Sequence, residues 1–176
     1  EPKCCKSFLG LSMAVSVAAG VPCLGRFPVA TRGPVLLYAA EDAPHIVRTR
    51  LHGICTSAQV PWDSLDVHVI VDPVVRLDVQ ADRGRLFEAA DRLRPRLIVL
   101  DPFVRLHRID ENTAAEVAPL LAYLRELQRS LGCAVVLVHH ARKGGHARAG
   151  QALRGSSELH AWGDSNLYLR RDAERL

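Results

Sequence analysis

The first residues of the chain have the types and spacing of a phosphate-binding loop. Residues 1–7 resemble the second half of G-x-x-x-x-G-K-[ST], with Lys6 and Ser7 at its last two positions and Cys5 in place of the second glycine. In this pattern backbone N–H groups surround phosphate oxygens, the lysine contacts phosphate and the hydroxyl binds Mg²⁺. An apolar run follows directly, as the pattern requires. We therefore expect the phosphates of a nucleotide to contact Cys4, Cys5, Lys6, Ser7 and Phe8, and Mg²⁺ to bind Ser7.

Two acidic residues follow apolar runs further along the chain. Asp101 comes directly after Leu97–Leu100, and Glu41 follows residues 34–40. We interpret Asp101 as a carboxylate that holds Mg²⁺ opposite Ser7, although a strand-terminal Asp can also simply begin a turn. Glu41 could orient and deprotonate an attacking water, or be an ordinary solvated acid.

A histidine pair and an arginine complete the candidate residues. His140 follows the apolar run 133–138 and could donate a hydrogen bond to a γ-phosphate, because the pair lacks the further ligands of a metal site. Arg154 could reach the active site of a neighbouring subunit, although a lone arginine is usually a surface charge. The basic, glycine-rich stretch 142–150 is either a flexible connection or a loop that follows a phosphate backbone.

The elements that must position these residues alternate along the chain. Short apolar runs between helical patterns predict an α/β fold with a mostly parallel sheet flanked by helices. We expect strands near residues 34–40, 67–71, 97–100, 133–138 and 166–169. Ligands of such sheets bind at the carboxyl ends of the strands, where Glu41, Asp101 and His140 would meet.

Local signals at helix starts are more specific. A buried helix is expected over residues 7–19, ended by Gly20. Asp42 is expected to cap the next helix, with Pro44 in its first turn. Thr113 and Glu116 are spaced as a capping box before the longest amphipathic pattern in the chain.

Length and composition restrict the class of protein. A chain of 176 residues is long enough for one domain with a substantial core, which we place at residues 1–176. The formal net charge of +4 permits a nucleic-acid partner without arguing for one. The 5 cysteines are odd in number and include no C-x-x-C, so neither zinc nor a disulfide framework is indicated. Reduced thiols and a cytoplasmic location are expected.

A secretory signal peptide is the rival interpretation of the first residues. Lys3 and Lys6 precede an apolar stretch that ends in small residues near Gly20. The stretch is shorter than the ~20 residues of a membrane span, and Pro22 ends it. The motifs that follow favour a cytoplasmic nucleotide enzyme with no membrane partner.

Together these segments resemble a known group of enzymes. The chain is similar to the RecA-like P-loop ATPases of the plasmid replicative helicase RepA type, in the DnaB-like and KaiC-like branch, with an AAA-type domain. The resemblance covers essentially the whole chain. It is carried by Lys6-Ser7, Tyr38–Asp42, Leu97–Asp101, Val138–His140 with Lys143-Gly144, and Arg154–Ser157, together with residues 20–27.

The resemblance implies roles for these residues. Lys6 and Ser7 would bind ATP and Mg²⁺, Glu41 would be the catalytic base, and Asp101 would be the second metal-binding group. His140 would sense the γ-phosphate, and Arg154 would act across a subunit interface. Members of the group form hexameric rings that couple ATP hydrolysis to movement on single-stranded DNA.

Two departures from the pattern shape our expectations. The first glycine of the loop and the strand before it are not in the sequence, so we expect an N-terminal truncation within the motif and a sheet that lacks this strand. Cys5 would crowd the approach of the backbone to the phosphates. A degenerate nucleotide-binding module without turnover and a KaiC-like regulatory ATPase are therefore alternatives to a helicase motor.

Overall fold

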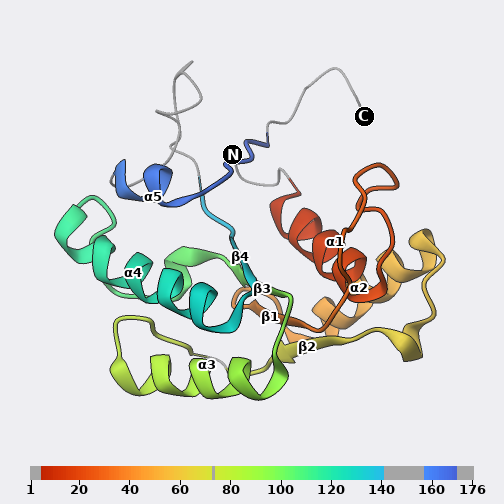
Figure 1. Ribbon diagram of the computed structural model, residues 1–176, viewed down its shortest axis with the longest axis horizontal. Coiled ribbons are helices and arrows are strands. Elements are labelled where there is room, and N and C mark those ends of the chain that lie inside the picture. Colours follow the sequence, from red (N-terminus) through yellow and green to blue (C-terminus); the bar gives the residue numbers. More distant parts are fainter. Residues whose placement is uncertain (1–4, 73, 141–156, 170–176) are drawn as a thin grey trace.

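The computed structural model describes residues 5–72, 74–140 and 157–169, in which helices and parallel strands alternate (Figure 1). In chain order the elements are α1 (Lys6–Ala19), β1 (Val35–Ala39), α2 (Pro44–Ala58), η1 (Trp62–Ser64), β2 (Val67–Ile70), α3 (Gln80–Leu93), β3 (Leu97–Asp101), η2 (Phe103–Arg105), α4 (Ala114–Leu131), β4 (Ala134–Leu137) and α5 (Ser157–Trp162). The predicted α/β fold is confirmed.

The four strands form one parallel sheet in the order β2-β1-β3-β4. Its two central strands pair from Val35 opposite Leu97 to Ala39 opposite Asp101, so β1 and β3 end side by side. The prediction of a strand at residues 166–169 is wrong, because this segment pairs with none of the described strands. Leu167 there is 67% exposed, so its apolar pattern reflects no burial within a sheet.

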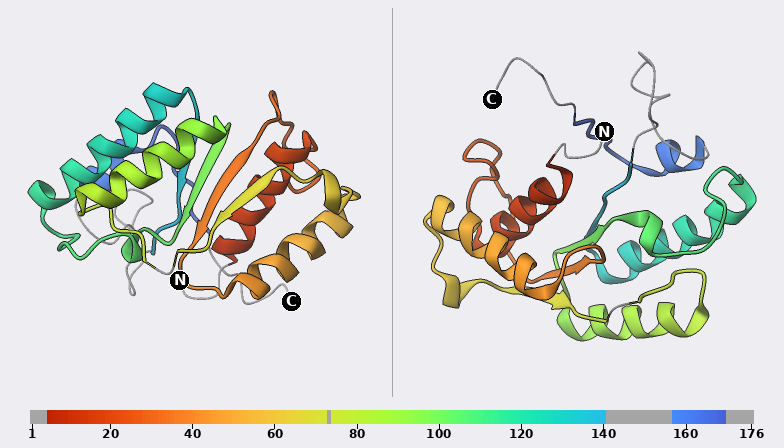
Figure 2. Two further views of the ribbon diagram at one scale, coloured as in Figure 1. Left: turned by 90° about the horizontal axis from the view of Figure 1, so that it is seen from below. Right: turned by 180° about the vertical axis from the view of Figure 1, so that it is seen from behind.

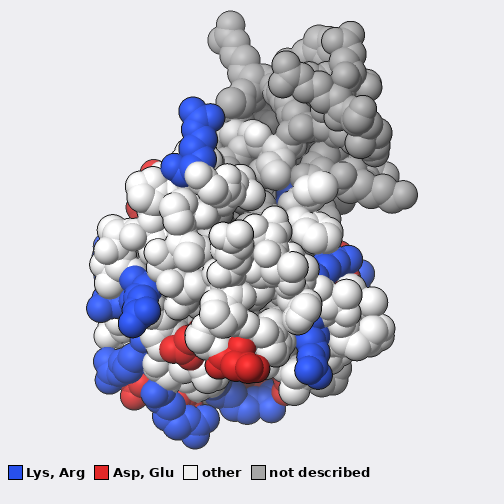
Figure 3. Space-filling view, turned by 90° about the vertical axis from the view of Figure 1, so that its right-hand side faces the viewer, with Lys and Arg blue, Asp and Glu red and all other residues white. Residues whose placement is uncertain are grey.

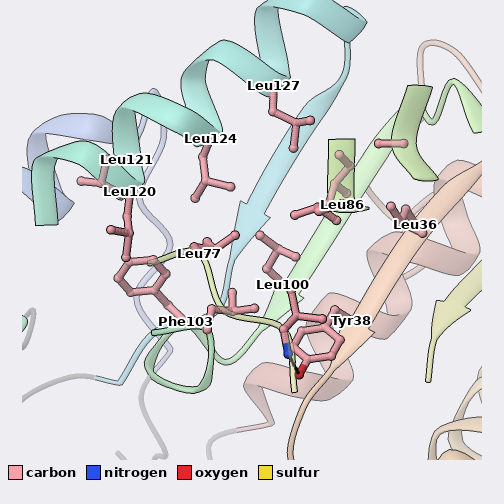
Figure 4. Packing of buried hydrophobic residues seen from close by; sticks show 14 of the residues in the cluster. Leu36, Tyr38, Leu77, Leu86, Leu100, Phe103, Leu120, Leu121, Leu124 and Leu127 are labelled. Atoms are coloured by element: carbon pink, nitrogen blue, oxygen red, sulfur yellow. Dashed lines mark hydrogen bonds between the residues drawn. The ribbon is translucent and has the colours of Figure 1, made fainter. Parts of the chain in front are cut away.

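Alternating side chains divide the core into two layers. Val35 and Leu37 of β1 pack toward α1 and α2, whereas Leu36 and Tyr38 pack toward α3 and α4. Strand β3 alternates in the same way. Figure 2 shows the sheet between these two helical layers, and Figure 4 shows leucines of α4 directed at Leu100 and Phe103. Because both faces of the sheet are covered, its central strands are apolar throughout.

Helix α1 lies close to the sheet. A Cβ added to Gly10 would lie 3.4 Å from Val99 Cγ1, so the absence of a side chain permits this approach. The helix ends at Gly20 as predicted, with a φ of 74°. The start of α1 is therefore held near the carboxyl end of β3.

The two predicted helix caps are wrong. Thr113 occupies the N-cap position of α4, but its hydroxyl lies 3.4 Å from the Asp110 carboxylate and makes no cap bond. Glu116 instead accepts a hydrogen bond from the backbone N–H of Asp110. At α2 the N-cap is Ala43, because the Asp42 carboxylate pairs with Arg50; Pro44 lies in the first turn as predicted.

Two negative findings concern the described residues alone. No helix there combines the length and apolar character needed to cross a membrane. The described cysteines, namely Cys5, Cys23, Cys55 and Cys133, are free thiols, as expected.

Candidate functional site

The carboxyl ends of β1, β3 and β4 meet at the start of α1, where Glu41, Asp101 and His140 lie near Lys6. The backbone N–H of Ala40 donates to the Asp101 carbonyl at 2.8 Å, which extends the pairing of β1 and β3 to the edge of the site. The charges of Lys6, Glu41 and Asp101 all act on the pKa of His140. Residues from four separate elements therefore form one cluster, as the sequence predicted.

The residue before α1 has a backbone conformation that favours glycine, the residue type of the phosphate-loop pattern at this position. Cys5 is the N-cap residue and has a φ of 56°, in the left-handed region that favours glycine. The Cys5 side chain makes no cap bond, and no acidic residue lies in the first turn of the helix. The first N–H groups of a helix have no partner within it and carry partial positive charge. An anion can therefore bind at this helix start.

Asp101 is a candidate metal ligand within this cluster. It is 9% exposed, and burial raises the pKa of its carboxyl group. The Ser7 hydroxyl donates a hydrogen bond to the carboxylate, which acts in the opposite direction on this pKa. A carboxylate beside a hydroxyl supplies the hard oxygen donors that Mg²⁺ prefers. The two residues therefore fit a magnesium site.

His140 is suited to donate a hydrogen bond as a neutral ring. Partial burial lowers its pKa, and the positive charge of Lys6 lowers it further. A neutral imidazole keeps one N–H donor and one acceptor. His139 differs, because its ring lies edge-on to Phe103 with centroids 6.1 Å apart. The structure thus separates the two histidines that the sequence places side by side.

Glu41 has a partner that sequence reasoning missed. Arg105 Nε, in the η2 turn that follows β3, donates to Glu41 Oε1 at 3.0 Å beyond the end of β1. Arg105 is one of many arginines in the chain, and no motif distinguishes it from the others. Only the fold brings it to Glu41.

A second arginine was missed for the same reason. Arg50 of α2 pairs with Asp42, and its guanidinium lies 5.2 Å from the centroid of the Phe8 ring. It therefore links the loop after β1 to the first turn of α1. Phe8, which we expected to contact ATP, is 45% exposed at this position.

A groove among the described residues adjoins the cluster. It has a volume of 440 Å³ and runs beside β4 between α1 and α5, with Lys6 and His139 among its lining residues. Most of its lining is apolar, including Met13 and Trp162. The polar cluster at the strand ends therefore borders an apolar groove.

Three predicted parts of the site lie outside the described residues. These are Cys4, Arg154 and the basic stretch 142–150. Their assigned roles remain predictions.

Comparison with known families identifies the kind of domain that this geometry belongs to. A family model described as an AAA domain matches residues 1–146. The matched range contains Lys6, Ser7, Glu41, Asp101 and His140, and it ends before Arg154. The match therefore includes every described residue of the cluster.

Proposed function

This chain belongs to the AAA-domain family of nucleotide-binding ATPases, and we propose that it hydrolyses ATP with Mg²⁺ at the carboxyl edge of its sheet. One observation carries the proposal. The Ser7 hydroxyl, in the first turn of α1, lies close enough to the buried Asp101 carboxylate to lower the pKa of that group. This proximity supports a phosphate site at the start of α1 with Mg²⁺ between Ser7 and Asp101.

Binding of the triphosphate would use the start of α1. The first N–H groups of the helix would contact phosphate oxygens, and Lys6 would neutralise part of their charge. Ser7 and Asp101 would hold Mg²⁺, which would supply positive charge against the phosphate oxygens. Phe8 and Cys5 would border the same loop.

Hydrolysis would use Glu41 and His140. A water oxygen attacks the γ-phosphorus, the bond to the β–γ bridging oxygen breaks, and ADP leaves with that oxygen. Glu41 accepts the proton of the attacking water. His140, neutral at neutral pH, donates its N–H to a γ-phosphate oxygen and so distinguishes ATP from ADP.

The finer proposal is a hexameric, RepA-like replicative helicase that moves on single-stranded DNA. It rests on the resemblance at Tyr38–Asp42, Val138–His140 and Arg154–Ser157, with Arg154 acting on the ATP of a neighbouring subunit. The stretch 142–150 would contact the DNA backbone. On the face drawn in Figure 3, the described Lys and Arg side chains are scattered and form no stripe, so surface charge there adds no support.

A second candidate function follows from Cys5. A side chain at a left-handed position beside the phosphates crowds the backbone that must contact them. The alternative is therefore a module that binds nucleotide weakly, or assembles, without turnover. The rate of ATP hydrolysis by the wild-type protein, measured when ATP is bound, separates the two functions.

The first prediction tests the proposed base. In the full-length protein carrying Cys5→Gly, Glu41→Gln keeps the shape of the side chain but removes its ability to accept a proton. Turnover should fall by roughly 10²–10⁴, the usual contribution of general base catalysis. ATP affinity should be retained, because Lys6 and the loop amides hold the phosphates. Steady-state hydrolysis and titration with a fluorescent ATP analogue measure the two quantities.

The matched control is Glu88→Gln on α3, which changes an exposed acid outside the cluster. It should leave both quantities unchanged. Full activity of Glu41→Gln would remove Glu41 from the mechanism. No turnover in the parent protein, despite ATP binding, would favour the module.

A further inference from the structure

We propose that Arg105 is a positioning residue that holds the Glu41 carboxylate in place for catalysis. The proposal rests on the proposed ATPase function and assigns a role to a residue that has no place in the loop or metal motifs. Its direct observation is the hydrogen bond of 3.0 Å from Arg105 Nε to Glu41 Oε1.

The backbone of Arg105 is fixed by its neighbours. It lies in η2, between Phe103 and Leu106, and both side chains are 0% exposed. The N–H of Phe103 donates to the carbonyl of Val138 at 2.8 Å, which joins η2 to the end of β4. Figure 4 shows the Phe103 ring within the core. The arginine side chain therefore extends toward Glu41 from a rigid base.

Glu41, in contrast, lies just beyond the paired part of β1. Its side chain is 45% exposed, so without a partner it would sample several rotamers in water. The bond from Arg105 selects one of them. Because this bond uses Oε1, the second carboxylate oxygen is the one that accepts the proton of the attacking water.

The neighbouring acid has a different arginine. Asp42 pairs with Arg50, which also stacks over Phe8. Asp42 thus pairs with the guanidinium of Arg50 from α2, and Glu41 pairs with that of Arg105 from η2. This arrangement keeps Asp42 from competing for Arg105.

Stability does not account for the Glu41–Arg105 pair. Both side chains are largely exposed, at 45% and 62%, and such pairs contribute little to folding. The position of a catalytic group matters far more, since small displacements of reacting groups cost up to about 10²-fold in rate. The pair should therefore affect turnover while leaving the fold unchanged.

The test compares Arg105→Ala, Arg105→Lys and the control Arg108→Ala in the full-length protein carrying Cys5→Gly. Arg108 is an exposed arginine three residues further along the same loop. Arg105→Ala should lower kcat about tenfold and leave the Kd of a fluorescent ATP analogue within about twofold. Arg105→Lys should recover part of the loss, because an ammonium group can still bond one carboxylate oxygen. Arg108→Ala should change neither quantity.

A double substitution tests whether Arg105 affects turnover through Glu41. In the Glu41→Gln background, Arg105→Ala should cause no further loss, because the base that it positions is already absent. Unchanged kcat in Arg105→Ala, or an equal loss in both backgrounds, would overturn the proposal while the ATPase function stands. A parent protein that binds ATP but shows no turnover would refute the proposed function, and the role of Arg105 with it.

Discussion

Asp101 is the last residue of β3. Its buried side chain lies among the groups that would bind a metal ion together with it. Burial raises the pKa of its carboxyl group, and the negative charges of Glu41 and Asp42 raise it further. Hydrogen bonding from Ser7 and the nearby His140 lower it. In metal-free protein the ionised form is therefore disfavoured by its surroundings. A bound divalent cation would supply the compensating charge.

A substitution of Asp101 should raise the stability of the metal-free protein and lower its ATPase activity. In the folded protein the pKa lies above its ordinary value of 3.8, so the native state binds this proton more tightly than the unfolded state does. Stability is then lost as the pH rises from 3.8 through the raised pKa. Asp101→Asn removes this loss. It should raise the Tm of metal-free protein at neutral pH, and Mg²⁺-dependent hydrolysis should fall by roughly 10²-fold or more.

Thermal unfolding in the presence of a chelator, at several pH values, measures the first effect. The gain in Tm should shrink as the pH approaches the ordinary carboxyl pKa. Asp78→Asn changes an exposed acid and is the control. A lower Tm for Asp101→Asn at neutral pH would show that neighbouring groups already stabilise the buried charge fully when no metal is bound.

At the scale of elements, the junction between the phosphate loop and α1 depends on Cys5. A residue with a Cβ in the left-handed region is disfavoured by about 1–2 kcal/mol. Glycine avoids this cost, although its greater freedom in the unfolded chain offsets roughly 0.5–1 kcal/mol. The same substitution removes the side chain that would crowd the phosphates. Stability and nucleotide affinity should thus change in the same direction.

We predict that Cys5→Gly tightens ATP binding and stabilises the protein by up to about 1.5 kcal/mol, the largest difference between these two effects. Titration with a fluorescent ATP analogue and thermal unfolding measure the two results. Cys5→Ala is the matched control, since it removes sulfur but keeps the Cβ, and it should give little gain. Equal tightening by both variants would show that the sulfur, rather than the backbone conformation, obstructs binding.

At the scale of the whole molecule, the proposed ring predicts that active sites are shared between subunits. Arg154→Ala should suppress turnover, because the charge acts on the ATP of a neighbour. Mixing Arg154→Ala subunits with Glu41→Gln subunits should restore part of the activity, since some interfaces then combine an intact Glu41 with an intact Arg154.

The measurement is ATP hydrolysis of the mixture compared with each variant alone. Subunit exchange is verified separately with labelled protein. If the mixture hydrolyses ATP no faster than expected from the two variants alone, in a preparation that exchanges subunits, a role for Arg154 in trans is contradicted.

The α/β fold and the position of three candidate site residues at strand ends could be predicted from the sequence alone. Apolar runs of strand length, separated by helical patterns, predicted the parallel sheet, because burial on both faces leaves a local signature in each strand. Glu41, Asp101 and His140 were found because they directly follow such runs. Cys5 was found because the loop pattern needs glycine there, and its φ of 56° agrees with that need.

The tertiary structure decided which partners each polar side chain has. Thr113, Glu116 and Asp42 each had a local capping role available, but all three bonded other groups that lay within reach. Residues 166–169 have the pattern of a strand but no pairing partner. Arg105 reaches Glu41 from 64 residues away, and Asp101 owes its raised pKa to burial. Hydrogen bonds and desolvation act over a few ångströms in space, so they depend on chain segments that no local pattern specifies.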